Sequence, residues 1–137
     1  MEGTNVGLRY GSWDTFNTWV QHGNNYQGWD LAFNIEYKRG GGDDSRIVER
    51  DLQSTLDLGF GTSASLAPGQ LYTDYEGLHG LLSLARKNWS FNFWGYVQDD
   101  ISQGMALTQN VDPLSTVDSR LFQADVMYDN DKLIEDV

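Results

Sequence analysis

The sequence lacks cysteine entirely, has only two prolines, and contains no long apolar run. The absence of thiols excludes disulfide bonds, thiolate nucleophiles and cysteine-ligated zinc sites. No stretch approaches the roughly 18 apolar residues of a membrane-spanning helix. Residues 1–4 lack the basic start and apolar core of a signal peptide, so an exported protein would already have lost its signal.

Basic residues are also scarce. The chain has 9 Lys and Arg against 20 Asp and Glu, which gives a formal net charge of −11 at pH 7. Nucleic acid would repel such a chain, so we expect no nucleic-acid partner. The simplest interpretation of the acidity is that it maintains solubility.

Aromatic residues and glycine, by contrast, are abundant. The 137 residues include 5 Trp, 7 Tyr, 6 Phe and 15 Gly. This composition favours pleated strands and tight turns over helices, and it provides enough apolar surface to exclude disorder. The length corresponds to about one domain.

The clearest pattern lies in residues 29–38, which alternate strictly between apolar and polar side chains. A period of two residues predicts a strand with two chemically different faces. One predicted face contains Trp29, Leu31, Phe33, Ile35 and Tyr37. The other contains Asp30, Asn34, Glu36 and Lys38, with small Ala32 among them.

Similar alternation recurs along the chain. Residues 89–98 form a predicted strand, with Trp94 and Tyr96 on the face opposite Phe91 and Phe93, and the short link 86–88 predicts a hairpin with residues 75–86. Further strands are predicted at 6–10, 15–22 and 120–128, and a truncated one at 132–137. Together they predict an all-β, antiparallel up-and-down meander of about six to seven strands, in one segment covering residues 1–137.

Two connections are long, at residues 40–73 and 99–118. Within the first, Ile47, Val48, Leu52 and Leu56 recur at helical spacing, which predicts a short helix at about 46–58. Asp44 or Ser45 is suited to cap its start, and Gly59 or Gly61 to end it.

Three features indicate an outer-membrane barrel rather than a soluble sheet. Trp29 and Tyr37 lie about 26 Å apart along the strand, or about 20 Å after tilting, and both residue types favour membrane interfaces. Tight turns at 11–14 and 86–88 alternate with the two long connections, as short periplasmic turns and long outer loops do in such barrels. The link 23–28 has an intermediate length and is predicted to be an outer loop. The polar face also suits a wet interior. A solvated sheet would alternate equally well, so this pattern leaves both interpretations open.

Residues 51–69 resemble a loop of TonB-dependent outer-membrane receptors, most specifically in the segment FGTSASLAPG at 60–69. Residues 7–12, and Leu107 with 111–113 before the strand at 120–128, extend the similarity. The resemblance implies a transport barrel in the outer membrane of a Gram-negative bacterium, which takes up a ligand such as a metal chelate or a saccharide. Its partners would be outer-membrane lipid and that ligand, with TonB contacted through a segment outside this chain.

This sequence shows no plug domain and no TonB-contacting segment, which such receptors have. The predicted six strands and part of a seventh are also fewer than the roughly eight of a closed barrel. We therefore expect a piece from the N-terminal part of the barrel. Its edges should stay exposed, pair with another copy, or be covered by the helix at 46–58.

No pattern in the sequence predicts catalysis, a metal site or a cofactor. His22 and His79 are predicted on polar strand faces, without a second ligand at a recognisable spacing. The acids at 43–44, 99–100 and 129–131 suit turns rather than a calcium loop. Carboxylates available for glycosidase chemistry are Glu36, Glu49, Glu76 and Asp125, with no motif to join them.

Ligand-contacting residues are not identified by the sequence. The aromatic residues available for stacking on a sugar are Trp13, Trp19, Trp94 and Tyr96, although barrel girdles and core packing use the same residue types. The alternative function is a soluble lipocalin-like barrel or a carbohydrate-binding β-sandwich. A small β-rich hydrolase is a weaker third.

Overall fold

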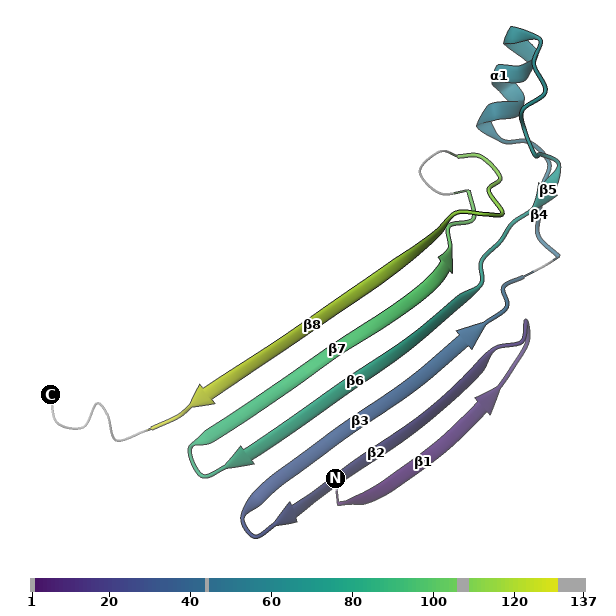
Figure 1. Cartoon of the computed structure of the whole chain (residues 1–137). Coiled ribbons are helices and arrows are strands. Elements are labelled where there is room, and N and C mark those ends of the chain that lie inside the picture. The colour runs from purple at the N-terminus through teal and green to yellow at the C-terminus, as the bar shows by residue number, and fades with distance from the viewer. Residues whose placement is uncertain (1, 44, 106–108, 131–137) are drawn as a thin grey trace, which may run out of the picture.

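The computed structural model describes residues 2–43, 45–105 and 109–130. Its main feature is one antiparallel sheet with the strand order β1-β2-β3-β6-β7-β8 (Figure 1). The strands are β1 (Gly3–Tyr10), β2 (Phe16–Tyr26), β3 (Trp29–Gly40), β6 (Tyr75–Arg86), β7 (Trp89–Ser102) and β8 (Thr116–Tyr128). The predicted meander is confirmed. The sheet does not close, so β1 and β8 are its open edges.

Antiparallel pairing aligns the alternating side chains of all six strands. Val20, for example, is paired with Val6 on one side and Ile35 on the other, and Leu82 lies between Phe33 and Phe93. Directly paired residues point to the same side of a sheet. The result is a continuous apolar face, made by Val6, Leu8, Val20, Leu31, Phe33, Ile35, Leu78, Leu82, Leu84, Phe91, Phe93, Val97, Phe122, Ala124 and Val126.

The opposite face is the polar face. Its members include Asn5, Asn17, Gln21, Asn34, Glu36, Lys38, Ser83, Asn92, Gln98, Gln123 and Asp125, with Trp19, His79, Trp94 and Tyr96 among them. The predicted faces of residues 29–38 and 89–98 are therefore confirmed. One assignment was wrong. His22 lies on the apolar face, paired with Phe33, because its strand runs in phase with Val20.

No second layer of the described structure covers the apolar face. Val6 and Leu8 are 70% and 71% exposed, and Val111, in a loop, is the one buried apolar residue of the described chain. Soluble monomers rarely expose an apolar surface of this extent. The sheet therefore lacks the hydrophobic core that would stabilise a free-standing domain.

The two ends of the sheet differ. At the end named here the turn edge, strands join through two-residue turns at 27–28 and 87–88. Connections 11–15, 41–74 and 103–115 all lie at the opposite end, the loop edge (Figure 1). The predicted grouping of 11–14 with the tight turns was wrong, because successive strands reverse direction. The predicted outer loop at 23–28 was also wrong: β2 continues to Tyr26, and Gln27 and Gly28 supply the positive φ angles, 53° and 82°, of a tight hairpin.

The long connections are slightly displaced from the predicted 40–73 and 99–118. Strand β7 extends to Ser102, and β8 begins at Thr116 beside an irregular register between Gln98 and Ile101. The predicted strand at 132–137 lies outside the described residues.

The helix, α1 (Leu52–Phe60), begins later than predicted. Residues Ile47–Val48 form strand β4, paired with β5 (Gly69–Gln70), so their apolar spacing reflects strand pairing rather than a helical turn. Asp51 caps the helix in place of Asp44 or Ser45, and Gly61, in the left-handed conformation with φ 66°, ends it. The helix stands beyond the loop edge and covers neither edge strand (Figure 1). Of the three alternatives expected for the edges, coverage by the helix was therefore wrong.

Gly95 and Gly80 are paired across β6 and β7 but have different surroundings. A Cβ at Gly95 would lie 2.5 Å from Phe122 Cδ1 and 2.8 Å from the Leu121 carbonyl oxygen, whereas none of the atoms considered lies within 4 Å of one at Gly80. We predict that Gly95→Ala destabilises the sheet by about 1–3 kcal/mol through overpacking. Gly80→Ala should be neutral or slightly stabilising. Urea midpoints compare the two, and equal effects would contradict this packing.

Candidate functional site

The long connections at the loop edge are joined to each other at the carboxylate of Asp51. Its Oδ1 accepts hydrogen bonds from the Ser54 amide (2.8 Å) and the Ser65 hydroxyl (2.7 Å), and its Oδ2 accepts one from the Val111 amide (3.1 Å). One side chain thus connects the helix, the segment at 60–69 and the second long connection. Asp51 is 6% exposed, so solvent does not compete strongly for these bonds.

The start of α1 is held by the same connection. The Leu52 amide donates to the Gln109 carbonyl oxygen (3.1 Å), and the Gln53 amide donates to Asn110 Oδ1 (2.9 Å). Amides in the first turn of a helix have no partner within the helix. Here the second connection supplies two acceptors, so its position and that of the helix depend on each other.

Asp57 shapes the segment FGTSASLAPG. Its carboxylate accepts hydrogen bonds from the Thr62 hydroxyl (2.5 Å) and from the amides of Ala64 and Ser65 (2.8 Å each). The Thr62 hydroxyl, the Ser65 amide and the Gln53 amide group lower the pKa of Asp57 to about 2. The hydroxyl of Ser65, with the Ser54 and Val111 amides, likewise holds the pKa of Asp51 well below its usual range. Both side chains act as acceptors in their charged form.

These connections also present apolar side chains to solvent. Leu58 and Phe60 on the helix are 82% and 78% exposed, and Leu114 in the second connection is 88% exposed. Hydrogen bonds hold the backbone of these connections in one arrangement, so the positions of the exposed side chains are also set. Such a surface is suited to contact with a ligand or partner.

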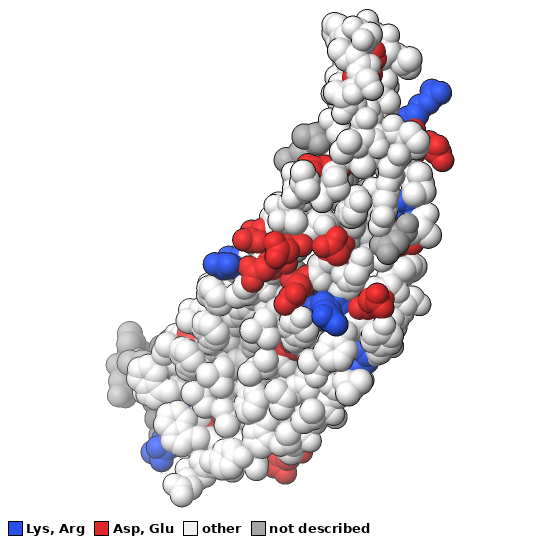
Figure 2. All heavy atoms as spheres, turned by 45° about the vertical axis from the view of Figure 1, so that its right-hand side comes forward, with Lys and Arg blue, Asp and Glu red and all other residues white. Residues whose placement is uncertain are grey.

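A hollow of about 410 Å³ lies where the strands meet the loops. Its lining combines acids, aromatic rings and one arginine: Tyr10, Asp14, Arg39, Gly40, Gly41, Asp74, Tyr75, Glu76 and Asp100. Tyr10 donates a hydrogen bond to Asp14 (2.6 Å), and Ser102 donates one to Asp74. Figure 2 shows charged side chains, mainly acidic, gathered in a belt across the molecule, with few charges between the belt and the end away from the helix.

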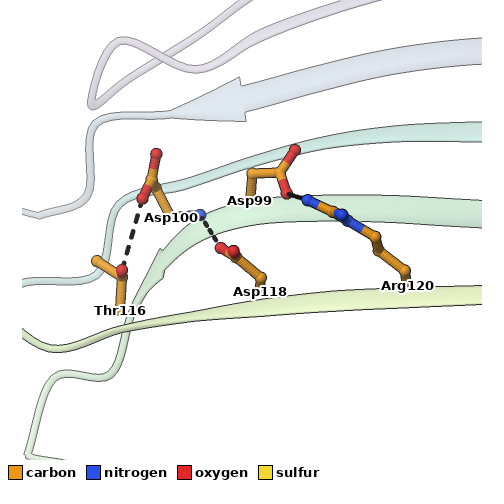
Figure 3. Close-up of polar contacts among 5 residues, drawn as sticks. All are labelled: Asp99, Asp100, Thr116, Asp118 and Arg120. Carbon is orange, nitrogen blue, oxygen red and sulfur yellow. Dashed lines mark hydrogen bonds and ion pairs between the residues drawn. The ribbon is translucent and has the colours of Figure 1, made fainter.

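Strands β7 and β8 are joined in this region by polar contacts around their irregular register (Figure 3). Arg120 forms an ion pair with Asp99 at 3.0 Å, and the Asp100 amide donates to Asp118 Oδ1 at 3.1 Å. The Thr116 hydroxyl donates a hydrogen bond to the carboxylate of Asp100 at 3.5 Å. The prediction that the acids at 99–100 lie in a turn was wrong, because β7 continues through both residues and their side chains contact β8.

The histidines do not form a common site. His22 bonds Thr4 Oγ1 (2.7 Å) and the Tyr26 hydroxyl (2.8 Å) and contacts the Phe33 ring, whereas His79 lies on the polar face. Within the described ranges no group of three or more His, Asp and Glu side chains is placed to hold a metal ion.

The carboxylates considered for glycosidase chemistry lie on separate elements. Glu36 accepts a hydrogen bond from Asn17, and Asp125 accepts one from Asn92. Glu76 lines the hollow at the loop edge, and Glu49 lies in the first long connection. The described structure pairs none of these four across a cleft. In the turn at residue 43, Asp43 bonds Ser45; the acids at 44 and 131 lie outside the described residues.

Of the four aromatic residues considered for sugar stacking, Trp19, Trp94 and Tyr96 share the polar face, while Trp13 lies in the connection 11–15. Trp94 stacks on Tyr96, and Tyr96 on His79, with centroid distances of 6.4 and 5.8 Å. Trp19 is separate, since its indole donates to Asn5 and Arg9 lies over its ring.

Sequence reasoning missed the role of Asp51 and the hollow at the loop edge. The spacing of Asp51 and Ser54 is that of a helix cap and its third residue, so the cap was detectable. The contact between Asp51 and Val111 was not, because 60 residues separate them and only the fold brings them together.

Comparison of the chain with protein-family models, with curated proteins and with solved structures found no match. Within the described residues no helix has the length and apolar character needed to cross a bilayer.

We predict that Asp51→Asn separates the two connections while keeping the helix cap. Asn caps helices as well as Asp does, because its side-chain oxygen can still accept from Ser54. The NH₂ group would then replace Oδ2, and it cannot accept a hydrogen bond from the backbone N–H of Val111. Amide hydrogen exchange at Val111 should accelerate. Asp43→Asn, in the same connection but without a bond to the second one, is the matched control. Unchanged protection of Val111 in Asp51→Asn would refute this role.

The low pKa of Asp57 predicts sensitivity to acid. The unfolded chain binds a proton near pH 4, whereas the folded segment does so near pH 2. The stabilisation is therefore complete above about pH 4 and is lost as the pH falls through about 2. Protection factors of the Ala64 and Ser65 amides should fall in this window. In Asp57→Asn the protection factors of these two amides should be low already at neutral pH. If the variant still lost protection between pH 4 and pH 2, Asp57 would not be the source of the acid sensitivity.

Proposed function

We propose that this chain forms part of the wall of an outer-membrane transport barrel of the TonB-dependent receptor type. In this proposal the parent protein takes up a ligand such as a metal chelate or a saccharide, and TonB acts through a segment outside this chain. The observation that carries the proposal is the apolar face, which is continuous over six strands and covered by no other part of the described structure.

The arrangement of rings around this face supports contact with lipid. At the turn edge, pairing aligns Tyr26 with Trp29 and Trp89 with Tyr128. Toward the loop edge, Phe16 and Tyr37 lie within 6.4 Å of each other. Trp and Tyr rings, which carry a polar atom, favour the boundary between hydrocarbon and water, and barrels carry girdles of aromatic residues at both boundaries.

The length of the apolar face is also suitable. Trp29 and Tyr37 are eight steps apart in the strand, or about 26 Å along it and about 20 Å after tilting. Beyond Tyr37 the same face becomes charged, with Arg39 and Glu76 paired across β3 and β6 and Asp99 next to them. The apolar side chains thus end where an aqueous phase would begin.

Closure requires additional strands. Unpaired backbone groups cannot face hydrocarbon, and about eight strands are the minimum for a closed barrel. Strands β1 and β8 run in opposite directions, so another antiparallel meander can join both edges without exchanging the two faces. The missing strands would come from the parent protein or from further copies of this chain.

The loop edge would then lie outside the cell, where ligands arrive. The hydrogen bonds of Asp51 hold the two long connections in a defined arrangement, and their exposed apolar side chains would be available for capture. A soluble carbohydrate-binding module is the second candidate. The stack of Trp94, Tyr96 and His79 on the polar face favours it, because rings of this kind stack on sugars.

Spin labels test the proposal cleanly, because the chain has no native cysteine. Labels at Phe33→Cys and Asn34→Cys lie on adjacent residues but opposite faces. In lipid vesicles we expect the label at 33 to collide with oxygen dissolved in lipid, and the label at 34 with a water-soluble nickel chelate. Water contact at 33, or a dry protein interior around it in lipid-free solution, would remove the transport proposal and favour the soluble module.

A further inference from the structure

Two adjacent cations, Arg86 and Lys87, lie at the turn edge. Both are exposed, and neither forms an ion pair within the described part of the chain. Lys87 lies in the two-residue β6–β7 turn and has the positive φ, 52°, of a tight hairpin. Among the described basic residues only Arg120 forms an ion pair, so Arg86 and Lys87 are distinguished by their position beside the aromatic rim and not by the lack of a partner.

Arg86 belongs to the aromatic rim of the apolar face. It is paired with Trp89, and its guanidinium lies 5.3 Å from the centre of the Trp29 ring. This contact positions the charge over a ring that itself favours the membrane boundary. Arginine is suited to such a position, because its aliphatic stem can lie on an apolar surface while its charged group stays in water.

Lys87 borders a hollow of about 510 Å³ that opens beside the same rim. The hollow is lined by Ala85, Lys87, Asn88, Trp89, Ser90, Met127, Tyr128 and Asp129. Trp89 and Tyr128 form its aromatic side, with ring centroids 4.7 Å apart. Asp129 is the one acid in this lining, and it forms no ion pair with Lys87.

The loop edge is more strongly acidic. There Arg120 is neutralised by Asp99, and Arg39 lines a hollow together with Asp14, Asp74, Glu76 and Asp100. The turn edge carries fewer described acids, Glu2, Asp30 and Asp129, beside Arg86 and Lys87. An anion is therefore repelled less there than at the loop edge, and these two cations supply the local attraction.

We propose that Arg86 and Lys87 bind the phosphate of an anionic phospholipid headgroup at the turn edge. The inference rests on the proposed function, because it places hydrocarbon against the apolar face next to these cations. A membrane lipid fits better than free phosphate, since the site is an open rim continuous with an apolar surface and not an enclosed cradle. It also assigns the turn edge to the leaflet that contains phospholipid.

Binding of the full chain to two kinds of vesicle tests this site. One kind contains phosphatidylcholine alone, and the other an equimolar mixture with phosphatidylglycerol. We expect tighter binding to the mixture in flotation assays. Arg86→Gln and Lys87→Gln should each weaken binding to the mixture roughly five-fold and leave binding to phosphatidylcholine unchanged. Arg86→Lys, which keeps the charge, should retain most of the preference.

Arg50→Gln is the matched control, because it removes the same charge from the exposed first connection at the loop edge. A loss as large in Arg50→Gln would show a general charge effect and overturn the site. Equal binding of the unsubstituted chain to both kinds of vesicle would also overturn the proposed lipid site, but it would not contradict the proposed function. Competition by inorganic phosphate beyond that of chloride at equal ionic strength would assign the site to free phosphate instead. Failure to bind either vesicle would count against the proposed function itself.

Discussion

Backbone pairing between antiparallel strands is the interaction on which the rest of this structure depends. Each ladder places directly paired side chains on the same side of the sheet, so the alternation within one strand becomes a row that crosses six strands. A shift of one residue in any pair would move apolar side chains to the polar face. The strong alternation of β3 and β7, at the interior of the sheet, opposes such a shift on both sides.

Side-chain packing contributes less here than in a compact domain. The described residues contain one buried apolar side chain, Val111, and it lies in a loop. The polar interactions that define tertiary structure are concentrated instead at the loop edge, where Asp51 and Asp57 organise the segment at 51–69. An apolar face that no other part of the described chain covers, together with loops ordered by their own hydrogen bonds, fits the transport barrel proposed above.

Local patterns predicted the strands well and their connections less well. The strands at 29–38 and 89–98 were found with the right faces, because strict alternation is a direct property of the pleat. The predictions were wrong where the preference of a residue type differed from the secondary structure that the residue adopts. The link 23–28 was interpreted as an outer loop, yet Asn24 and Asn25 continue β2, and a tight turn forms at Gln27 and Gly28. Ile47 and Val48 fitted helical spacing, yet they pair with Gly69 and Gln70, a contact that no short window of sequence contains.

The sequence by itself determined the existence of the strands, their two-faced character, the reversal at 86–88 and the position of the long connections. These properties depend on neighbouring residues, whose alternation and turn preferences act over a few positions. Only the tertiary structure decided which edge each turn occupies, that His22 belongs to the apolar face, that β1 and β8 each have one unpaired side, and that Asp51 reaches Val111. Such features depend on register and strand direction, which accumulate over the whole sheet because each strand is positioned by the one paired beside it.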